Sequence, residues 1–224
     1  MIKKIVAIKF QFALFFKEIE NRPDKLFNKI NDDLELPFTE IPNIMNIPVG
    51  APLEIPIVTI NDNKNLRSLN IGRLRLDYIK NINNKPIDNS MKNFLLEIKE
   101  CANILEKYKK LFRFGFIAEY FIEVQDPVGY ITKTFYKKEP SNLIEISFRT
   151  NERISLENNN YNFVKNIQAL ERIVDNDKKN GILLQMDFNN VPSDNIILVK
   201  EILHSIEIGK IRFTEASVGE DFNE

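Results

Sequence analysis

The stretch LFRFGFIAEYFIEV, residues 111–124, places an apolar side chain at every even position, while arginine, glycine or glutamate occupies several odd positions. Successive side chains of a β-strand point to opposite faces of a sheet. The period of two therefore predicts a long strand with one apolar face and one partly apolar face. The fold class follows from the segments on either side of this strand.

Residues 90–108, just before it, predict the clearest helix of the chain. Ser90 is a residue type that caps helix N-termini, and charged residues occupy the face opposite an apolar stripe. The stripe comprises Met91, Phe94, Leu95, Ile98, Cys101, Ala102, Leu105 and Tyr108. A second strong helix is predicted between Ser193, as its cap, and Gly209, as its stop. A short helix is predicted within 20–33, with Asn21 as cap and Pro23 in the first turn.

Further strands are predicted from alternation and from turn residues. They cover 8–14, a hairpin over 55–80 with a bulge or turn near Gly72, and the segments 130–136, 142–150, 153–157, 161–174 and 181–188. The sum is an α+β fold: a large, mostly antiparallel sheet with two long helices and one short helix. We predict a single domain over 1–224, and the order of the elements suggests two related halves, 1–110 and 111–224.

A proline-spaced segment, 36–56, interrupts this pattern. It carries aliphatic residues rather than the glycine, serine and charge of a flexible linker. Because each proline lacks an amide donor, the segment fits neither a helix nor a central strand. We predict an extended strap whose aliphatic side chains pack onto the domain. A lid or partner-binding arm is the alternative, because long loops in compact domains are often functional.

Composition predicts a cytoplasmic protein. The single cysteine, Cys101, cannot form an intramolecular disulfide, which favours a reducing compartment. Lys9 and Gln11 interrupt the apolar N-terminal run, so it reads as a strand rather than a signal peptide. No uncharged stretch approaches the roughly 20 residues of a membrane helix. We therefore expect no membrane association.

Motifs for catalysis or for cofactors are weak. Cys101 and His204 fall on or near apolar helix stripes, which favours core or core-edge positions over a nucleophile and its base. The segment DNDKKNG, 175–181, departs from a calcium loop and reads as a hairpin turn. Glu97 and Lys99 fit the exposed face of a helix. We expect no cofactor, no metal and no catalytic residue.

Basic residues are concentrated between Lys64 and Arg113. This segment contains twelve basic and five acidic residues, in a chain of net charge -1. This concentration predicts a surface for nucleic acid or for an acidic partner. The candidate residues lie on the hairpin and around the end of the following helix: Arg67, Arg73, Arg75, Lys107, Lys109, Lys110 and Arg113.

Three segments resemble a sporadically distributed family of uncharacterised bacterial proteins: Arg113 to Tyr120, Leu183 to Phe188 and Arg212 to Thr214. Gln185 replaces the first acid of the family's late strand, and the asparagine expected after the central strand is missing. The family has no assigned reaction, so the resemblance supplies no catalytic residue. Its patchy distribution implies a role in mobile elements, phage conflict or toxin-related systems.

The leading hypothesis is a non-enzymatic protein-interaction module, such as an inhibitor or accessory factor in phage defence or anti-defence, that holds a protein partner. The alternative is an RNA- or DNA-binding module that uses the basic surface within 64–113. A third hypothesis is a small-molecule sensor with the strap as its lid. The sequence specifies no oligomeric state.

Overall fold

The protein is described here by a computed structural model, which defines residues 4–48, 50–83, 86–137, 142–157, 159–174, 177–220 and 222. Its described strands form one antiparallel sheet of nine strands, in the order β2-β3-β4-β5-β1-β6-β9-β8-β7. The strands are β1 (Lys4–Phe16), β2 (Asn43–Ile44), β3 (Val58–Asp62), β4 (Arg67–Ile71), β5 (Arg75–Asn81), β6 (Leu111–Glu123), β7 (Ser147–Leu156), β8 (Asn159–Val174) and β9 (Asp177–Asn190).

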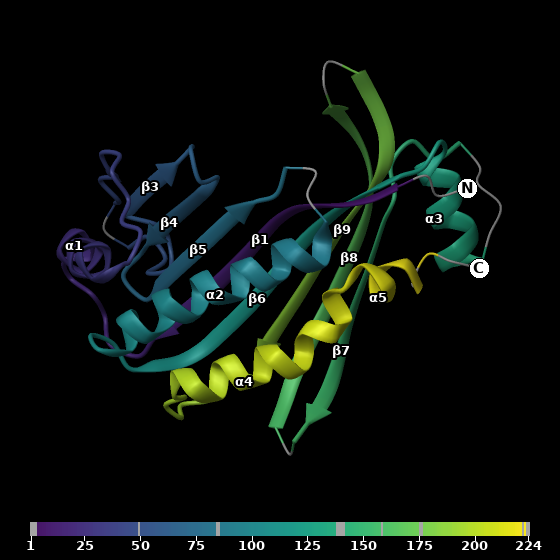
Figure 1. Cartoon of the computed structure of the whole chain (residues 1–224). Helices are drawn as coiled ribbons and strands as arrows, with labels where there is room; N and C mark the ends of the chain where they lie inside the picture. The colour runs from purple at the N-terminus through teal and green to yellow at the C-terminus, as the bar shows by residue number, and fades with distance from the viewer. Residues whose placement is uncertain are drawn as a thin grey trace.

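Helices are layered on one face of this sheet (Figure 1). They are α1 (Pro23–Asp33), α2 (Ile87–Glu106), α3 (Pro127–Tyr136), α4 (Val199–Gly209) and α5 (Glu215–Glu220), with a short 3-10 turn, η1 (Lys210–Phe213), after α4. In Figure 1, α2 and α4 run across the middle of the sheet, α1 lies at its β3 end and α3 at its β7 end. The α+β class and the antiparallel sheet are confirmed.

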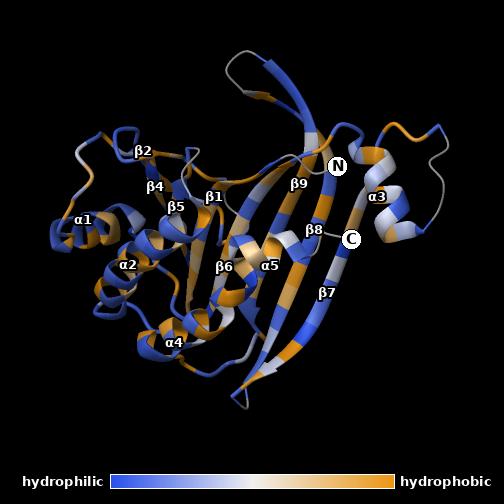
Figure 2. Ribbon diagram, turned by 45° about the vertical axis from the view of Figure 1, so that its right-hand side comes forward, coloured by the Kyte–Doolittle hydropathy of each residue, from blue (hydrophilic) through white to orange (hydrophobic). Residues whose placement is uncertain are grey.

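The strand predicted over 111–124 is β6, at the centre of the sheet between β1 and β9. Its even-numbered side chains from Phe114 to Tyr120 are buried beneath the helices. Phe94 of α2 packs between Phe10 of β1 and Phe116 of β6, with ring centroids 5.6 Å and 5.8 Å apart. The Tyr120 hydroxyl donates a hydrogen bond to the Phe213 carbonyl in η1. Orange and blue alternate along these strands in Figure 2.

Helix boundaries differ from the prediction. Helix α2 begins at Ile87, after Pro86, and Ser90 lies inside it without a capping bond. Helix α4 begins only at Val199, so Ser193 is not its cap and the second helix is 11 residues long. At α1 the N-cap is Arg22 rather than Asn21. The expected set of two long helices and one short one is therefore not confirmed, since five helices are described.

The strand predicted over 130–136 is wrong, because these residues belong to α3. The Asp126 carboxylate caps the helix by accepting a hydrogen bond from the Gly129 backbone N–H, and Pro127 occupies the first turn. Phe135 of α3 stacks on Phe148 of β7 at 5.1 Å. The cap and this contact outweigh the strand propensity of the aromatic and β-branched residues.

Most other predicted strands are confirmed, but the two predicted over 142–150 and 153–157 are one strand, β7, which begins only at Ser147. Residues 161–174 lie in β8 and 181–188 in β9, and the two strands pair as far as Val174 and Asp177, at the predicted hairpin. The change of phase near Gly72 is a turn between β4 and β5, where the Gly72 N–H donates to the Arg75 carbonyl. One sheet and one core span both sides of residue 110, so two related halves are not confirmed.

The strap is attached mainly by backbone hydrogen bonds. The Leu53 carbonyl accepts hydrogen bonds from the N–H groups of Arg73 and Leu74, and β2 pairs with β3. Five of its large apolar side chains are exposed: Leu36 54%, Ile41 93%, Ile44 59%, Met45 37% and Ile55 36%. The prediction that the aliphatic side chains pack onto the domain is therefore wrong for these residues, whereas Ile47 and Leu53 are half-buried and Phe38 is buried. Val49 lies outside the described residues.

No helix in the described part of the chain combines the length and apolar character of a membrane span.

Candidate binding face of the sheet

The face of the sheet opposite the helices is formed by alternate residues of each strand, and we call it the open face. On β6 the open face consists of the odd-numbered residues, because the even-numbered ones pack beneath the helices. Helix α3 also lies on the covered side, since its partner Phe148 pairs with the buried Ile167. No described helix covers the open face.

A row of three side chains crosses the open face over β5, β1 and β6. Phe15 pairs directly with Arg75 on one side and with Arg113 on the other. The two guanidinium carbons lie 5.0 Å and 4.8 Å from the centroid of the Phe15 ring. Guanidinium groups stack on aromatic faces at these distances. The row therefore presents an aromatic ring flanked by two cations.

Arg75 and Arg113 differ in their partners. The Arg75 Nη2 donates to Asp77 Oδ1 at 2.7 Å, and the Gln11 amide donates to the same oxygen at 2.9 Å. The buried Nε of Arg113 has no hydrogen-bond partner among the described residues. Most buried polar groups in proteins are hydrogen-bonded, so this Nε is an exception, and the Arg113 guanidinium is held by its contact with the Phe15 ring rather than by a carboxylate.

On β9 and β8 the open face carries amide side chains. The Asn162 amide donates to Asn189 Oδ1 at 3.0 Å, and the Asn189 amide donates to Asp187 Oδ1 at 3.1 Å. On the next row, Glu119 accepts from Lys9 at 2.8 Å and from the Gln185 amide at 3.1 Å. These groups form a polar network with acceptors and donors on a partly accessible surface.

A recess of about 180 Å³ opens in this network between β6, β9, β8 and β7. It is lined by Ile117, Arg149, Val164, Asn166, Gln185 and Asp187. Burial raises the pKa of Asp187, and this is only partly opposed by the hydrogen bond from Asn189 and by the charges of Arg113, Arg75 and Arg149. Among the described residues, this half-buried acid lies near several cations without a direct ion pair.

The structure brings together only part of the predicted basic set. Arg75 and Arg113 share the row around Phe15. Arg67 is buried on the covered side, where its Nε donates to Asp62 Oδ2 at 2.9 Å and its guanidinium lies 4.3 Å from the Phe38 ring centroid. It is a structural residue, so its assignment to a binding surface is wrong. A count of charged residues along the sequence does not show which of them are buried by contacts with neighbouring strands.

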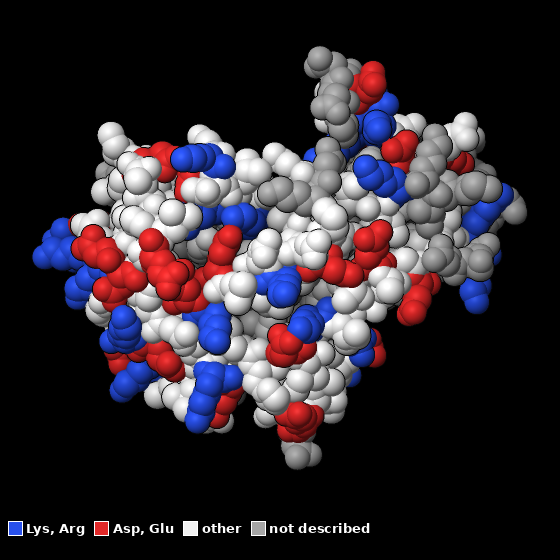
Figure 3. Space-filling model, viewed as in Figure 1, with Lys and Arg blue, Asp and Glu red and all other residues white. Residues whose placement is uncertain are grey.

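The remaining predicted residues are not part of the row. Lys107 pairs with Asp33 at 2.9 Å and Lys109 with Glu20 at 2.8 Å, while Arg73 and Lys110 are exposed. On the helix-bearing side, basic and acidic side chains intermingle (Figure 3). The seven residues therefore do not form one continuous basic patch.

Sequence reasoning missed Phe15, Arg149 and Asp187. Their signal was the face of each alternating strand that lies opposite the apolar face, and this face was interpreted only as the reverse of a core face. Their assembly depends on the strand order, which places β1 beside β6 and β7 beside β8.

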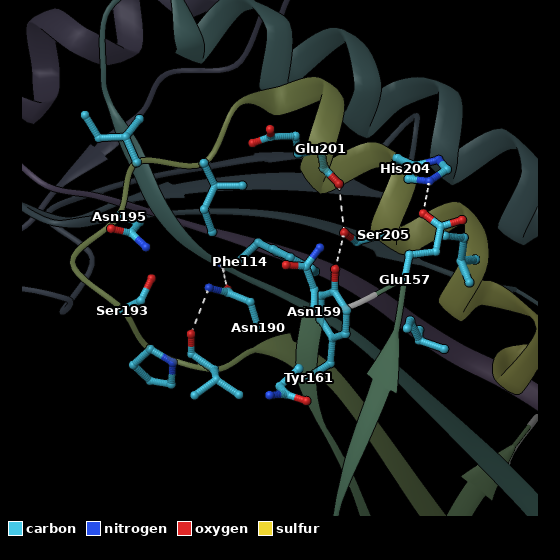
Figure 4. Close-up of a pocket in the computed structure, with 17 residues that line it drawn as sticks. Phe114, Glu157, Asn159, Tyr161, Asn190, Ser193, Asn195, Glu201, His204 and Ser205 are labelled. Carbon is cyan, nitrogen blue, oxygen red and sulfur yellow. Dashed lines mark hydrogen bonds and ion pairs between the residues drawn. The ribbon is translucent and has the colours of Figure 1, made fainter.

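A larger cavity of about 520 Å³ lies between α4, the loop after β9 and the β7–β8 hairpin (Figure 4). Several of its polar groups already bind one another. Tyr161 and Ser205 share a hydrogen bond of 2.7 Å, and Ser205 Oγ donates to the Glu201 carbonyl at 2.8 Å. His204 instead contacts Glu157 at 2.6 Å, so the serine and the histidine do not form a nucleophile–base pair.

The single cysteine does not contribute to either site. Cys101 is fully buried in α2, as its place in the apolar stripe predicts, and burial raises the pKa of its thiol to about 12. The described residues contain no cluster of three or more His, Cys, Asp or Glu side chains that could hold a metal ion.

No protein-family model, curated protein or solved structure matches this chain.

Proposed function

We propose that this chain is a non-enzymatic binding protein that holds single-stranded nucleic acid on the open face of its sheet. The observation that carries the proposal is the row Arg75–Phe15–Arg113, in which two guanidinium groups flank an aromatic ring on a face that no described helix covers.

Single strands are recognised by stacking of unpaired bases on aromatic rings or guanidinium planes, and by hydrogen bonds to their exposed edges. The row supplies the stacking planes, and the amides of Gln11, Asn162 and Asn189 supply donors and acceptors. Arg149 and Arg153, both exposed on β7, extend the basic character to the sheet edge. From Arg75 on β5 to β7 the face spans five strand spacings, roughly 24 Å.

The salt dependence of the affinity distinguishes nucleic acid from uncharged ligands. Binding to phosphates releases counterions, so the affinity falls as the salt concentration rises. We expect a modest slope, since Asp77 and Glu119 already neutralise Arg75 and Lys9. Arg113 and Arg149 are then the cations that bring most of the phosphate contact.

The test is fluorescence anisotropy with single-stranded RNA and DNA of about 12 nucleotides, measured between about 50 and 200 mM salt. The variant Arg113→Glu should lose binding, and Arg149→Glu should weaken binding and flatten the salt slope. Lys99→Glu, an equal charge change on the exposed face of α2, is the matched control. Equal losses in all three variants, or no binding by the wild-type chain, would contradict the proposal.

A second candidate function, protein docking, is favoured by the exposed aliphatic side chains of the strap. Ile41 and Ile44 lie at or beside β2, the strand at one edge of the sheet. Exposed apolar residues beside a free strand edge suit an extended apolar segment of a protein partner that adds a strand to β2. An inhibitory or accessory role in phage conflict, and a cytoplasmic location, stay predictions of the sequence.

Site-specific photo-crosslinking tests this second function. A crosslinker at Ile41 should capture one protein that a crosslinker at Lys99 does not, and Ile44→Asp should abolish that capture. Equal capture from both positions, or capture unaffected by Ile44→Asp, would count against docking at β2.

A further inference from the structure

The recess beside Asp187 lies on the same open face as the arginine row. Ile117, in its wall, is four residues from Arg113 along β6, which corresponds to about 13 Å. A strand of a few nucleotides that stacks on the row would therefore reach the recess.

The walls of the recess combine an apolar surface with directed polar groups. Ile117 and Val164 pair with Asp187 from either side, so two aliphatic side chains flank the carboxylate. Gln185 and Asn166, which pair with one another, form the next row. Arg149 pairs with Asn166 and closes the recess from β7. A flat ring could contact the aliphatic side chains while its edge meets the acid.

The carboxylate of Asp187 retains accepting capacity. Its Oδ1 accepts one hydrogen bond, from the Asn189 amide, and its Oδ2 has no hydrogen-bond partner among the described residues. An ionised carboxylate has about four lone-pair sites on two oxygens, which suits two parallel donors. Asp187 therefore favours a ligand edge with adjacent N–H groups.

Among the nucleobases, guanine has this edge, because its N1–H and its 2-amino group lie side by side. Adenine and cytosine present an amino group beside an acceptor, and uracil presents one N–H between two carbonyls. We propose, on the basis of the proposed function, that the recess binds a guanine of a single-stranded nucleic acid and that Asp187 accepts its N1–H and 2-amino hydrogens. Arg149 then lies within the recess wall, where it contacts the acceptors or phosphate of the same nucleotide.

Burial of Asp187 is consistent with this assignment. Desolvation raises the pKa of the acid, and the charges of Arg113, Arg75 and Arg149 favour its ionised form. Two donors from a base would add hydrogen bonds to the carboxylate. Such bonds would explain why an acid lies on a surface that binds a polyanion.

The experiment compares oligonucleotides of about 12 uridines that differ at one central position, which is guanosine, inosine, adenosine, cytidine or uridine. A good bidentate contact gives roughly five- to 150-fold discrimination, so we expect guanosine to bind about tenfold more tightly than adenosine, cytidine or uridine. Inosine, which lacks the 2-amino group, should fall between them.

Asp187→Asn preserves the size of the side chain and should remove the preference for guanosine while the uridine oligonucleotide still binds. Gln168→Ala, on the same face but outside the recess, should keep the preference. Equal binding of all five oligonucleotides, or a guanosine preference that survives Asp187→Asn, would overturn the guanine assignment and leave the proposed function intact. No binding of any oligonucleotide would overturn both.

Discussion

Phe15 of β1 lies directly opposite Arg113 of β6, with the guanidinium carbon 4.8 Å from the centre of the ring. The pair joins residues that are 98 positions apart in the sequence, and only the neighbouring places of β1 and β6 in the sheet bring them together. The buried Arg113 Nε has no hydrogen-bond partner among the described residues, whereas Arg75 on the other side of Phe15 is paired with Asp77.

Replacing Arg113 by lysine separates stacking from charge. Lysine keeps the cation but lacks the planar group that stacks on rings and bases. Base stacking contributes about 1–3 kcal/mol per base, so Arg113→Lys should weaken binding of a single strand by about tenfold with an unchanged salt slope. Titrations of both proteins at several salt concentrations give this comparison. An affinity equal to that of the wild type would show that Arg113 acts only as a charge.

The buried pair Arg67–Asp62 should contribute to stability. Removing one partner of a buried ion pair costs about 3–5 kcal/mol, because the other charge stays buried. We expect Arg67→Met to lower the free energy of unfolding in urea by about 3 kcal/mol. The exposed pair Lys107–Asp33 is the control, since Lys107→Met should cost less than about 1 kcal/mol. Similar losses in the two variants would contradict the structural role of Arg67.

Asp62 also gives this contribution a pH dependence. Burial opposes ionisation, but hydrogen bonds from Asn65 and the contact with Arg67 hold the pKa of Asp62 at about 2. A carboxyl whose pKa is lowered on folding stabilises the fold above its unfolded pKa of about 3.9, and this contribution is lost as pH falls through the folded value. The stability difference between the wild type and Asp62→Asn should therefore shrink between about pH 4 and pH 2. A difference that stays constant over this range would contradict it.

Asp187 should behave in the opposite way. Burial raises the pKa of its carboxyl, so the wild type loses stability as pH rises from the unfolded pKa of about 3.9 through the folded value. Asp187→Asn, which cannot ionise, should be at least as stable as the wild type at neutral pH, and its advantage should vanish near about pH 4. Thermal melts at both pH values measure this. A strongly destabilised Asp187→Asn at neutral pH would show that the ionised carboxylate supports the fold.

Gly72 should be required where the strap meets the turn between β4 and β5. A Cβ at this position would lie 2.7 Å from the Ile55 carbonyl oxygen and 2.9 Å from that of Glu54, both backbone atoms. Gly72→Ala should therefore cost about 1–3 kcal/mol of stability and make the strap more sensitive to proteolysis. Limited proteolysis with mapped cleavage sites tests it. An unchanged cleavage rate within 36–56 would show that the strap does not depend on this contact.

The alternation of apolar and polar residues in the sequence predicts individual strands, and it correctly identified those over 111–124, 161–174 and 181–188. It could not show which polar residues meet across strands, because Phe15, Arg75 and Arg113 are joined by the strand order. Helix α3 was missed because its aromatic and β-branched residues favour a strand locally, while Asp126 and Phe148 decide for the helix.

The strap and Arg67 show the same limit for burial. Aliphatic residues in 36–56 predict a covered segment, yet the backbone bonds of Leu53 fix the chain with Ile41 and Ile44 pointing outward. Arg67, a charged residue, is buried because Asp62 and the carbonyls of Leu36 and Pro37 satisfy it. Hydropathy alone therefore predicts the wrong burial for the exposed isoleucines and for the buried arginine.

Amide chemical-shift mapping of the isotope-labelled chain during titration with a single-stranded oligonucleotide tests the binding face most directly. We predict that the largest shifts fall on open-face residues of β1, β5, β6 and β9, centred on Phe15 and Arg113. Shifts confined to the strap or to the cavity beside α4, or no shifts at all, would contradict nucleic-acid binding on the open face.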